Sequence, residues 1–71
     1  MKLPRVSGRK VIKILSKQGF EVLRQKGSHV FLRHSNGKTT VIPNHKEIDK
    51  GTLLEIIRQA GLTRDEFLEL I

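Results

Sequence analysis

Two histidines are the side chains in this sequence best suited to move a proton near neutral pH. His29 ends the segment Lys26-Gly27-Ser28-His29, and His45 follows a Pro-Asn pair. Histidine changes charge near neutrality, which suits it to act as a general acid or base. RNA carries its own nucleophile, the 2′-hydroxyl, so its cleavage requires a base, an acid for the leaving 5′-oxygen and positive charge around the phosphate. One histidine among basic residues would meet this demand without a metal.

The positive charge that such chemistry needs is concentrated in the first half of the chain. Residues 1–38 contain ten basic residues and one acidic residue, whereas residues 39–71 contain four basic and six acidic ones. A small domain with one strongly basic part is typical of proteins that bind a polyanion, and nucleic acid is the commonest polyanion. A basic surface that only aids solubility is the alternative interpretation.

Length and composition exclude several other classes of protein. With 71 residues, the chain 1–71 is predicted to form a single domain, too short for a Rossmann or barrel enzyme. The absence of cysteine excludes disulfides, thiolate zinc sites and a cysteine nucleophile. There is no His-x-x-x-His pair, and Ser28 lacks the Gly-x-Ser-x-Gly frame of a serine hydrolase. Because no apolar run approaches the ~18 residues of a membrane span and no signal segment is apparent, we expect a cytoplasmic protein without membrane association or cofactor.

Capping signals predict three helices, over about 8–18, 50–60 and 64–70. Each begins after a good N-cap residue that is flanked by an apolar pair five residues apart. These N-cap residues are Ser7, Asp49 and Thr63. Glu66 completes a capping box with Thr63, and glycines at 19 and 61 suit the left-handed position that ends a helix.

Three strands are predicted between the first two helices, at 20–24, 29–34 and 39–42, where β-branched and aromatic residues are frequent. Asn36-Gly37 predicts a type I′ turn, and Gln25-Lys26-Gly27 predicts a three-residue loop. These turns pair Leu32 with Val41, Val30 with Val22, and Phe20 with Leu32. The five side chains would then share the face beneath the helices. The opposite face would hold Leu23, His29, Phe31, Arg33, Thr40 and Ile42.

The predicted fold class is α+β, a two-layer sandwich in α-β-β-β-α order with a three-stranded antiparallel sheet and a short C-terminal helix. In the expected register His29 lies across from Asn44, so His29, Asn44 and His45 converge near one end of the sheet. His34 lies at the other end of its strand and is interpreted as a surface residue.

The first helix has an apolar arc and an opposite face that is basic and contains no acid. A helix that serves only solubility usually mixes charge signs to gain i,i+4 pairs, so contact with phosphates is favoured slightly over a merely solvated face. The basic residues of this face are Arg9, Lys10, Lys13 and Lys17.

The order and spacing of several short motifs, spanning roughly residues 5–67, resemble the HicA family of bacterial toxin–antitoxin systems. The matching segments are Gly19-Phe20, Gly27-Ser28-His29, Val41-Ile42-Pro43-Asn44-His45, Lys50-Gly51-Thr52-Leu53 and Ile57-Arg58-Gln59-Ala60-Gly61-Leu62. The resemblance implies a ribosome-independent mRNA interferase with a fold like the double-stranded-RNA-binding domain, held inactive by a HicB-type antitoxin. It also implies that His29 is the catalytic residue. Many relatives place a second histidine directly after it, where this chain has Val30, so His45, Lys26 or water remain candidates for the general acid.

We therefore predict a metal-independent endoribonuclease toxin that cleaves mRNA, with His29 as general acid/base and His45 as a second catalytic candidate. The residues expected to bind RNA are Lys10, Lys13, Lys17, Arg24, Lys26, Ser28 and Arg33. Phe31 would stack an RNA base, contact the antitoxin, or be buried if the register slips by one residue. The alternative functions are a non-catalytic RNA-binding module and an adaptor that binds an acidic protein.

Overall fold

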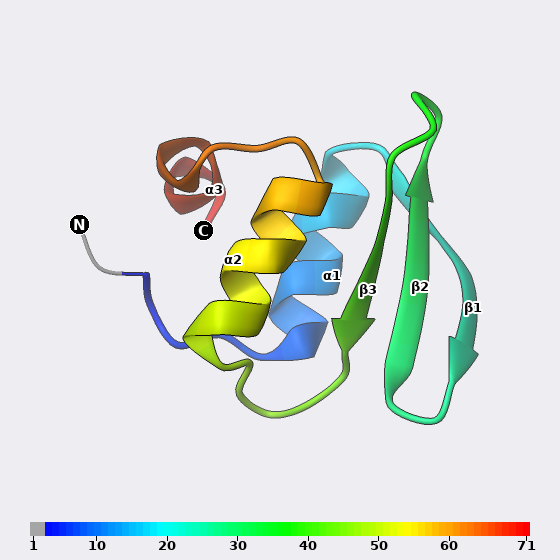
Figure 1. The fold of residues 1–71 in the computed structure, drawn as a ribbon, viewed down its shortest axis with the longest axis horizontal. Helices are drawn as coiled ribbons and strands as arrows, with labels where there is room; N and C mark the ends of the chain where they lie inside the picture. Colours follow the sequence, from blue (N-terminus) through cyan, green and yellow to red (C-terminus); the bar gives the residue numbers. More distant parts are fainter. Residues whose placement is uncertain (1–2) are drawn as a thin grey trace.

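A computed structural model describes residues 3–71, so the first two residues of the predicted domain lie outside the described part. The elements are α1 (Gly8–Lys17), β1 (Phe20–Lys26), β2 (His29–His34), β3 (Thr39–Pro43), α2 (Lys50–Gln59) and α3 (Arg64–Leu70). The strands form one antiparallel sheet in the order β1-β2-β3, and α1 and α2 lie against one face of it (Figure 1). This is the predicted α+β fold, with the sheet's other face left uncovered by helices.

The predicted helix starts are confirmed by their hydrogen bonds. The Ser7 hydroxyl accepts the Lys10 amide at 3.0 Å, and the Asp49 carboxylate accepts both the amide and the hydroxyl of Thr52. These bonds from Thr52 lower the pKa of Asp49. Thr63 and Glu66 form the expected reciprocal capping box. Local sequence therefore suffices to begin each helix, because a short polar side chain satisfies amides that the helix leaves unpaired.

The core lies between the helices and the inner face of the sheet. Its most completely buried side chains are Val11, Leu15, Leu32, Ile42, Leu53, Ile56 and Phe67. Phe20 and Val30 also point into it. Since successive side chains of a strand alternate between faces, burial of Val30 and Leu32 places His29, Phe31 and Arg33 on the outer face of β2. We call this helix-free side of the sheet the open face.

The predicted pairing of β2 with β3 is wrong by one residue. The His34 amide donates to the Lys38 carbonyl and the Gly37 amide to the His34 carbonyl, which leaves a three-residue loop, Ser35–Gly37. Within residues 3–71 only glycines have positive φ, and Gly37 has φ +91°. A type I′ turn needs positive φ at Asn36 as well, whereas this loop matches a type I turn followed by a left-handed glycine.

The shift exchanges the two faces of β3. Leu32 pairs with Thr40 rather than Val41, and Val30 pairs with Ile42. Thr40 and Ile42, expected on the open face, are therefore buried, and Val41, expected beneath the helices, is 37% exposed. A one-residue slip has this effect because the side-chain period of a strand is two.

The predicted pairing of β1 with β2 is also wrong. Gly27-Ser28 forms a two-residue turn with Gly27 at φ +59°, so β1 extends to Lys26, which pairs with His29. A bulge between Val22 and Arg24 adds an unpaired residue, Leu23. Val22 consequently pairs with Leu32 rather than Val30, Phe20 pairs with His34 rather than Leu32, and Val22 is 51% exposed at the sheet edge.

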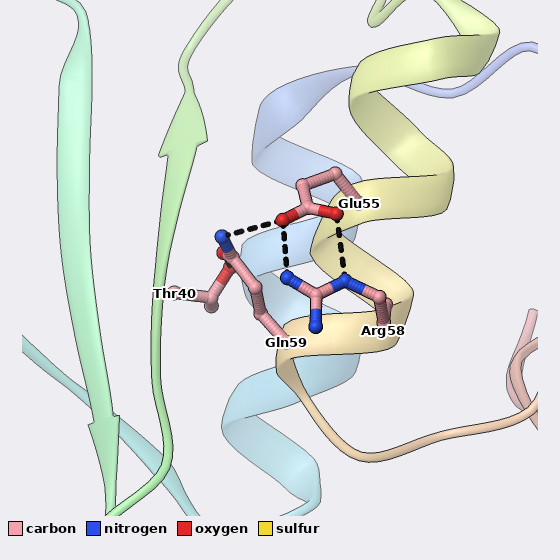
Figure 2. Close-up of polar contacts among 4 residues, drawn as sticks. All are labelled: Thr40, Glu55, Arg58 and Gln59. Carbon is pink, nitrogen blue, oxygen red and sulfur yellow. Dashed lines mark hydrogen bonds and ion pairs between the residues drawn. The ribbon is translucent and has the colours of Figure 1, made fainter.

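The buried threonine of β3 is held by a polar chain from α2. The Thr40 hydroxyl donates to Gln59 Oε1 at 2.8 Å, and Gln59 Nε2 donates to Glu55 Oε2 at 3.1 Å. Glu55 in turn accepts two hydrogen bonds from the Arg58 guanidinium, which lower the pKa of its carboxyl (Figure 2). Since a buried hydroxyl without a partner is costly, this chain explains how a core position on β3 tolerates threonine.

No helix within residues 3–71 is both long and apolar enough to cross a membrane.

Gly8 and Gly51 offer a matched test of how closely α1 approaches β3, since both lie in the first turn of a helix. A Cβ on Gly8 would overlap the Pro43 carbonyl oxygen and lie 2.8 Å from Asn44 Cα. A Cβ on Gly51 would meet only Asp49 Oδ2, at 3.5 Å. We expect Gly8→Ala to destabilise the fold by about 1–3 kcal/mol. Gly51→Ala should be neutral or stabilising by up to about 1 kcal/mol. Urea denaturation measures both, and a shift of both midpoints in the same direction would contradict the close approach.

Candidate functional site

Three chain segments meet at the end of the sheet where His29 lies. The Asn44 amide donates to the Ser28 carbonyl at 2.6 Å, and the Gly8 amide donates to the His45 carbonyl at 2.9 Å. The β1–β2 turn, the residues after β3 and the start of α1 are thereby joined at one end of the molecule, the lower end in Figure 1. We call this region the His29 end. Its formation explains why Gly8 must lack a side chain.

His29 is exposed on the open face of this end. It pairs with Lys26 on one side and with Pro43 on the other. Within residues 3–71 its ring makes no hydrogen bond or ion pair, and the residue is exposed to solvent. Lys26 shares the open face because directly paired residues point to the same side of a sheet. A cation therefore flanks the imidazole, as acid–base chemistry on a phosphate requires.

The expected convergence of His29, Asn44 and His45 needs one correction. Pro43, not Asn44, lies across from His29, and Asn44 instead bonds to the backbone of Ser28. The cause is the longer β2–β3 loop, which shifts β3 by one residue. His45 follows at the same end and is exposed, with its carbonyl bound to Gly8.

The turn between β1 and β2 decides which cations lie on the open face. It pairs Lys26 with His29 and, two residues further from the turn, Arg24 with Phe31, so both cations share the side of His29. The bulge at Leu23 then reverses the alternation along the rest of β1, so that Val22 pairs with buried Leu32 and Phe20 enters the core. No glycine or other residue pattern in β1 marks this bulge in the sequence.

The Arg24 guanidinium lies over the Phe31 ring, with its central carbon 4.6 Å from the ring centroid. This distance is within the range of a cation–π interaction, which holds the charged group of an arginine over an aromatic face. Phe31 is half-buried and has Val41 as its partner on β3. Phe31 is thus on the open face, as the sequence predicted, although the register used to place it there was wrong.

The residues predicted to bind RNA lie on both layers of the sandwich. Arg24, Lys26 and Arg33 lie on the open face, and Ser28 is half-buried in the turn at the His29 end. The α1 lysines are all exposed but belong to the helical layer. Lys10 is in the first turn of α1, at the His29 end, whereas Lys17 is in the last turn, about 10 Å further along the helix axis.

His34 is a structural histidine rather than the surface residue that the sequence suggested. It is half-buried, with Nε2 2.9 Å from the Gln18 carbonyl and Nδ1 accepting the Asn36 amide at 3.0 Å. Its ring also packs edge-on against Phe20, at 5.1 Å between centroids. These contacts require the neutral ring to carry its proton on Nε2 and leave neither nitrogen free.

Across the part of the chain that the structure describes, no group of three or more His, Cys, Asp or Glu residues is arranged to hold a metal ion.

The two histidines should differ sharply in their effect on stability. His29→Ala removes an exposed side chain and is expected to change the free energy of unfolding by no more than about 0.5 kcal/mol. His34→Ala removes two hydrogen bonds and the contact with Phe20, and should cost about 1–3 kcal/mol. Urea denaturation of both variants checks this. A large loss of stability in His29→Ala alone would mean that His29 has the structural role.

A family model described as the HicA toxin of bacterial toxin–antitoxin systems matches residues 8–62 of the chain. No curated protein matches the chain.

Proposed function

Because the chain belongs to the HicA family of toxins from bacterial toxin–antitoxin systems, we propose that it is an endoribonuclease that cleaves mRNA by acid–base catalysis at His29. The observation that carries this proposal is the exposed imidazole beside Lys26, on a face where Arg24 and Arg33 also lie. A cognate HicB-type antitoxin would neutralise the toxin, as the resemblance implies.

The proposed reaction needs few groups from the protein. His29 takes the proton of a ribose 2′-hydroxyl, and the 2′-oxygen attacks the adjacent phosphorus. The bond to the 5′-oxygen breaks, that oxygen is protonated by a general acid, and the products are a 2′,3′-cyclic phosphate and a free 5′-hydroxyl. Positive charge from Lys26 and Arg24 stabilises the phosphate in the transition state. Since the nucleophile belongs to the RNA, no metal-activated water is required.

Three groups are candidates for the general acid. His45 and Lys26 both belong to the His29 end, and water is the third. Lys26 is the nearest by strand pairing, because it is the direct partner of His29. His45→Ala tests the second histidine, since a general acid typically contributes 10²- to 10⁴-fold in rate.

We expect the purified protein to cleave single-stranded RNA oligonucleotides as fast in the presence of EDTA as in its absence. His29→Ala should lower the rate by about 10²- to 10⁴-fold without changing the RNA affinity greatly. Cleavage is followed by gel electrophoresis of end-labelled RNA, and the matched control is Lys38→Ala, at the opposite end of the sheet. A 2′-deoxy substitution at the cleaved nucleotide should abolish cleavage. Binding without cleavage by the wild-type protein would instead support a non-catalytic RNA-binding module.

The phosphate contacts can be counted from the salt dependence of binding in the His29→Ala background. Each lost contact should reduce the slope of log K against log salt by about 0.7 for single-stranded RNA. We expect this from Lys26→Ala and Lys10→Ala, and not from Lys38→Ala. Unchanged slopes for all three variants would mean that Lys10 and Lys26 do not belong to the RNA interface. If the wild-type protein showed no measurable RNA affinity, an adaptor that binds an acidic protein would be favoured instead.

A further inference from the structure

The open face carries an apolar centre that the proposed chemistry does not use. Phe31 and Val41 pair across β2 and β3 on this face, and Leu23 of β1 lines a shallow hollow there together with Glu21 and Arg33. Each of the three strands thus contributes one hydrophobic side chain. Leu23 is 59% exposed and Val41 37% exposed, and Phe31 is half-buried beneath Arg24. A hydrophobic strip of this kind on a small sheet is unusual unless a ligand covers it.

Charge around this strip favours an anionic ligand. Arg24, Lys26 and Arg33 surround it, and Glu21, the partner of Arg33, is the acidic residue of the three strands. An aromatic ring with an arginine guanidinium over it, among further cations, is an arrangement on which unpaired nucleobases stack while their phosphates meet basic side chains. Double-stranded RNA offers no exposed base face to such a ring.

The spacing along β2 links this strip to His29. His29 and Phe31 are two residues apart on the same side of one strand, which separates their Cα atoms by about 6.7 Å. A phosphate held at His29 therefore leaves the neighbouring base within reach of Phe31 and Arg24. The geometry points to a base-stacking subsite formed by Phe31 and Arg24, which makes the protein selective for an unpaired nucleotide next to the cleaved phosphate. This inference rests on the proposed function for the position of the phosphate.

The test is a double-mutant cycle between protein and RNA in the His29→Ala background. Phe31→Leu keeps the apolar volume and removes the aromatic face, whereas Phe31→Tyr keeps the face. We expect Phe31→Leu to weaken binding of a single-stranded oligonucleotide by about 5- to 100-fold. Phe31→Tyr should retain the affinity of the protein with Phe31. An abasic site beside the cleaved position should weaken binding to wild-type Phe31 by a similar factor. On the abasic RNA, Phe31→Leu should then have no further effect.

The outcomes separate this inference from the proposed function. Two results would overturn the subsite while leaving the proposal of RNA cleavage intact. One is that His29→Ala binds, and the wild-type protein cleaves, a duplex as well as the single strand of the same sequence. The other is full additivity of the effects of Phe31→Leu and the abasic site on binding. If wild-type protein fails to cleave RNA but an abasic nucleotide within the bound oligonucleotide is coupled to Phe31, the subsite stands and the catalytic proposal falls. A Phe31→Leu variant that binds RNA normally and loses affinity only for an acidic protein partner would assign the strip to protein binding and overturn the inference.

Discussion

The two-residue period of the strands is the constraint on which this molecule's surface chemistry depends. Whichever side chain shares a face with Val30 faces the helices, and whichever shares a face with His29 faces solvent. The Gly27-Ser28 turn pairs Lys26 with His29 and Arg24 with Phe31, which puts both cations on the solvent side. One additional residue in β1, Leu23, then reverses the alternation, so that the same strand also brings Phe20 into the core.

The contacts that hold the His29 end together leave its candidate catalytic group free. Backbone bonds from Asn44 to Ser28 and from Gly8 to His45 tie three segments together without using a histidine side chain. His34, at the other end, shows the contrary arrangement, because both of its ring nitrogens are engaged and its ring packs on Phe20. Within one strand, therefore, one histidine is available for chemistry and the other stabilises the fold.

A chain of polar side chains stabilises the contact between α2 and the buried face of β3. Thr40 occupies a core position only because Gln59 reaches it from α2, and Gln59 is itself held by Glu55. The chain connects α2 to β3 by a directional contact, whereas the surrounding apolar side chains contribute packing without direction. Side chain–side chain bonds of this kind help to fix which face of β3 turns inward.

The sequence by itself determined the elements, the helix caps, the inward face of β2 and the position of His29 and Phe31 on the open face. Capping and glycine signals act within a few residues, so they can be read without knowledge of the fold. Strand register was not determined in this way. Asn36-Gly37 and Gly27 each suit more than one loop length. Packing against α1 and α2, together with the hydrogen bond from Thr40 to Gln59, selects burial of Thr40 and Ile42 over Val41. The bulge at Leu23 and the approach of Gly8 to Pro43 likewise depend on residues distant in sequence, so only the tertiary structure decided that Leu23 is unpaired and that Gly8 must lack a side chain.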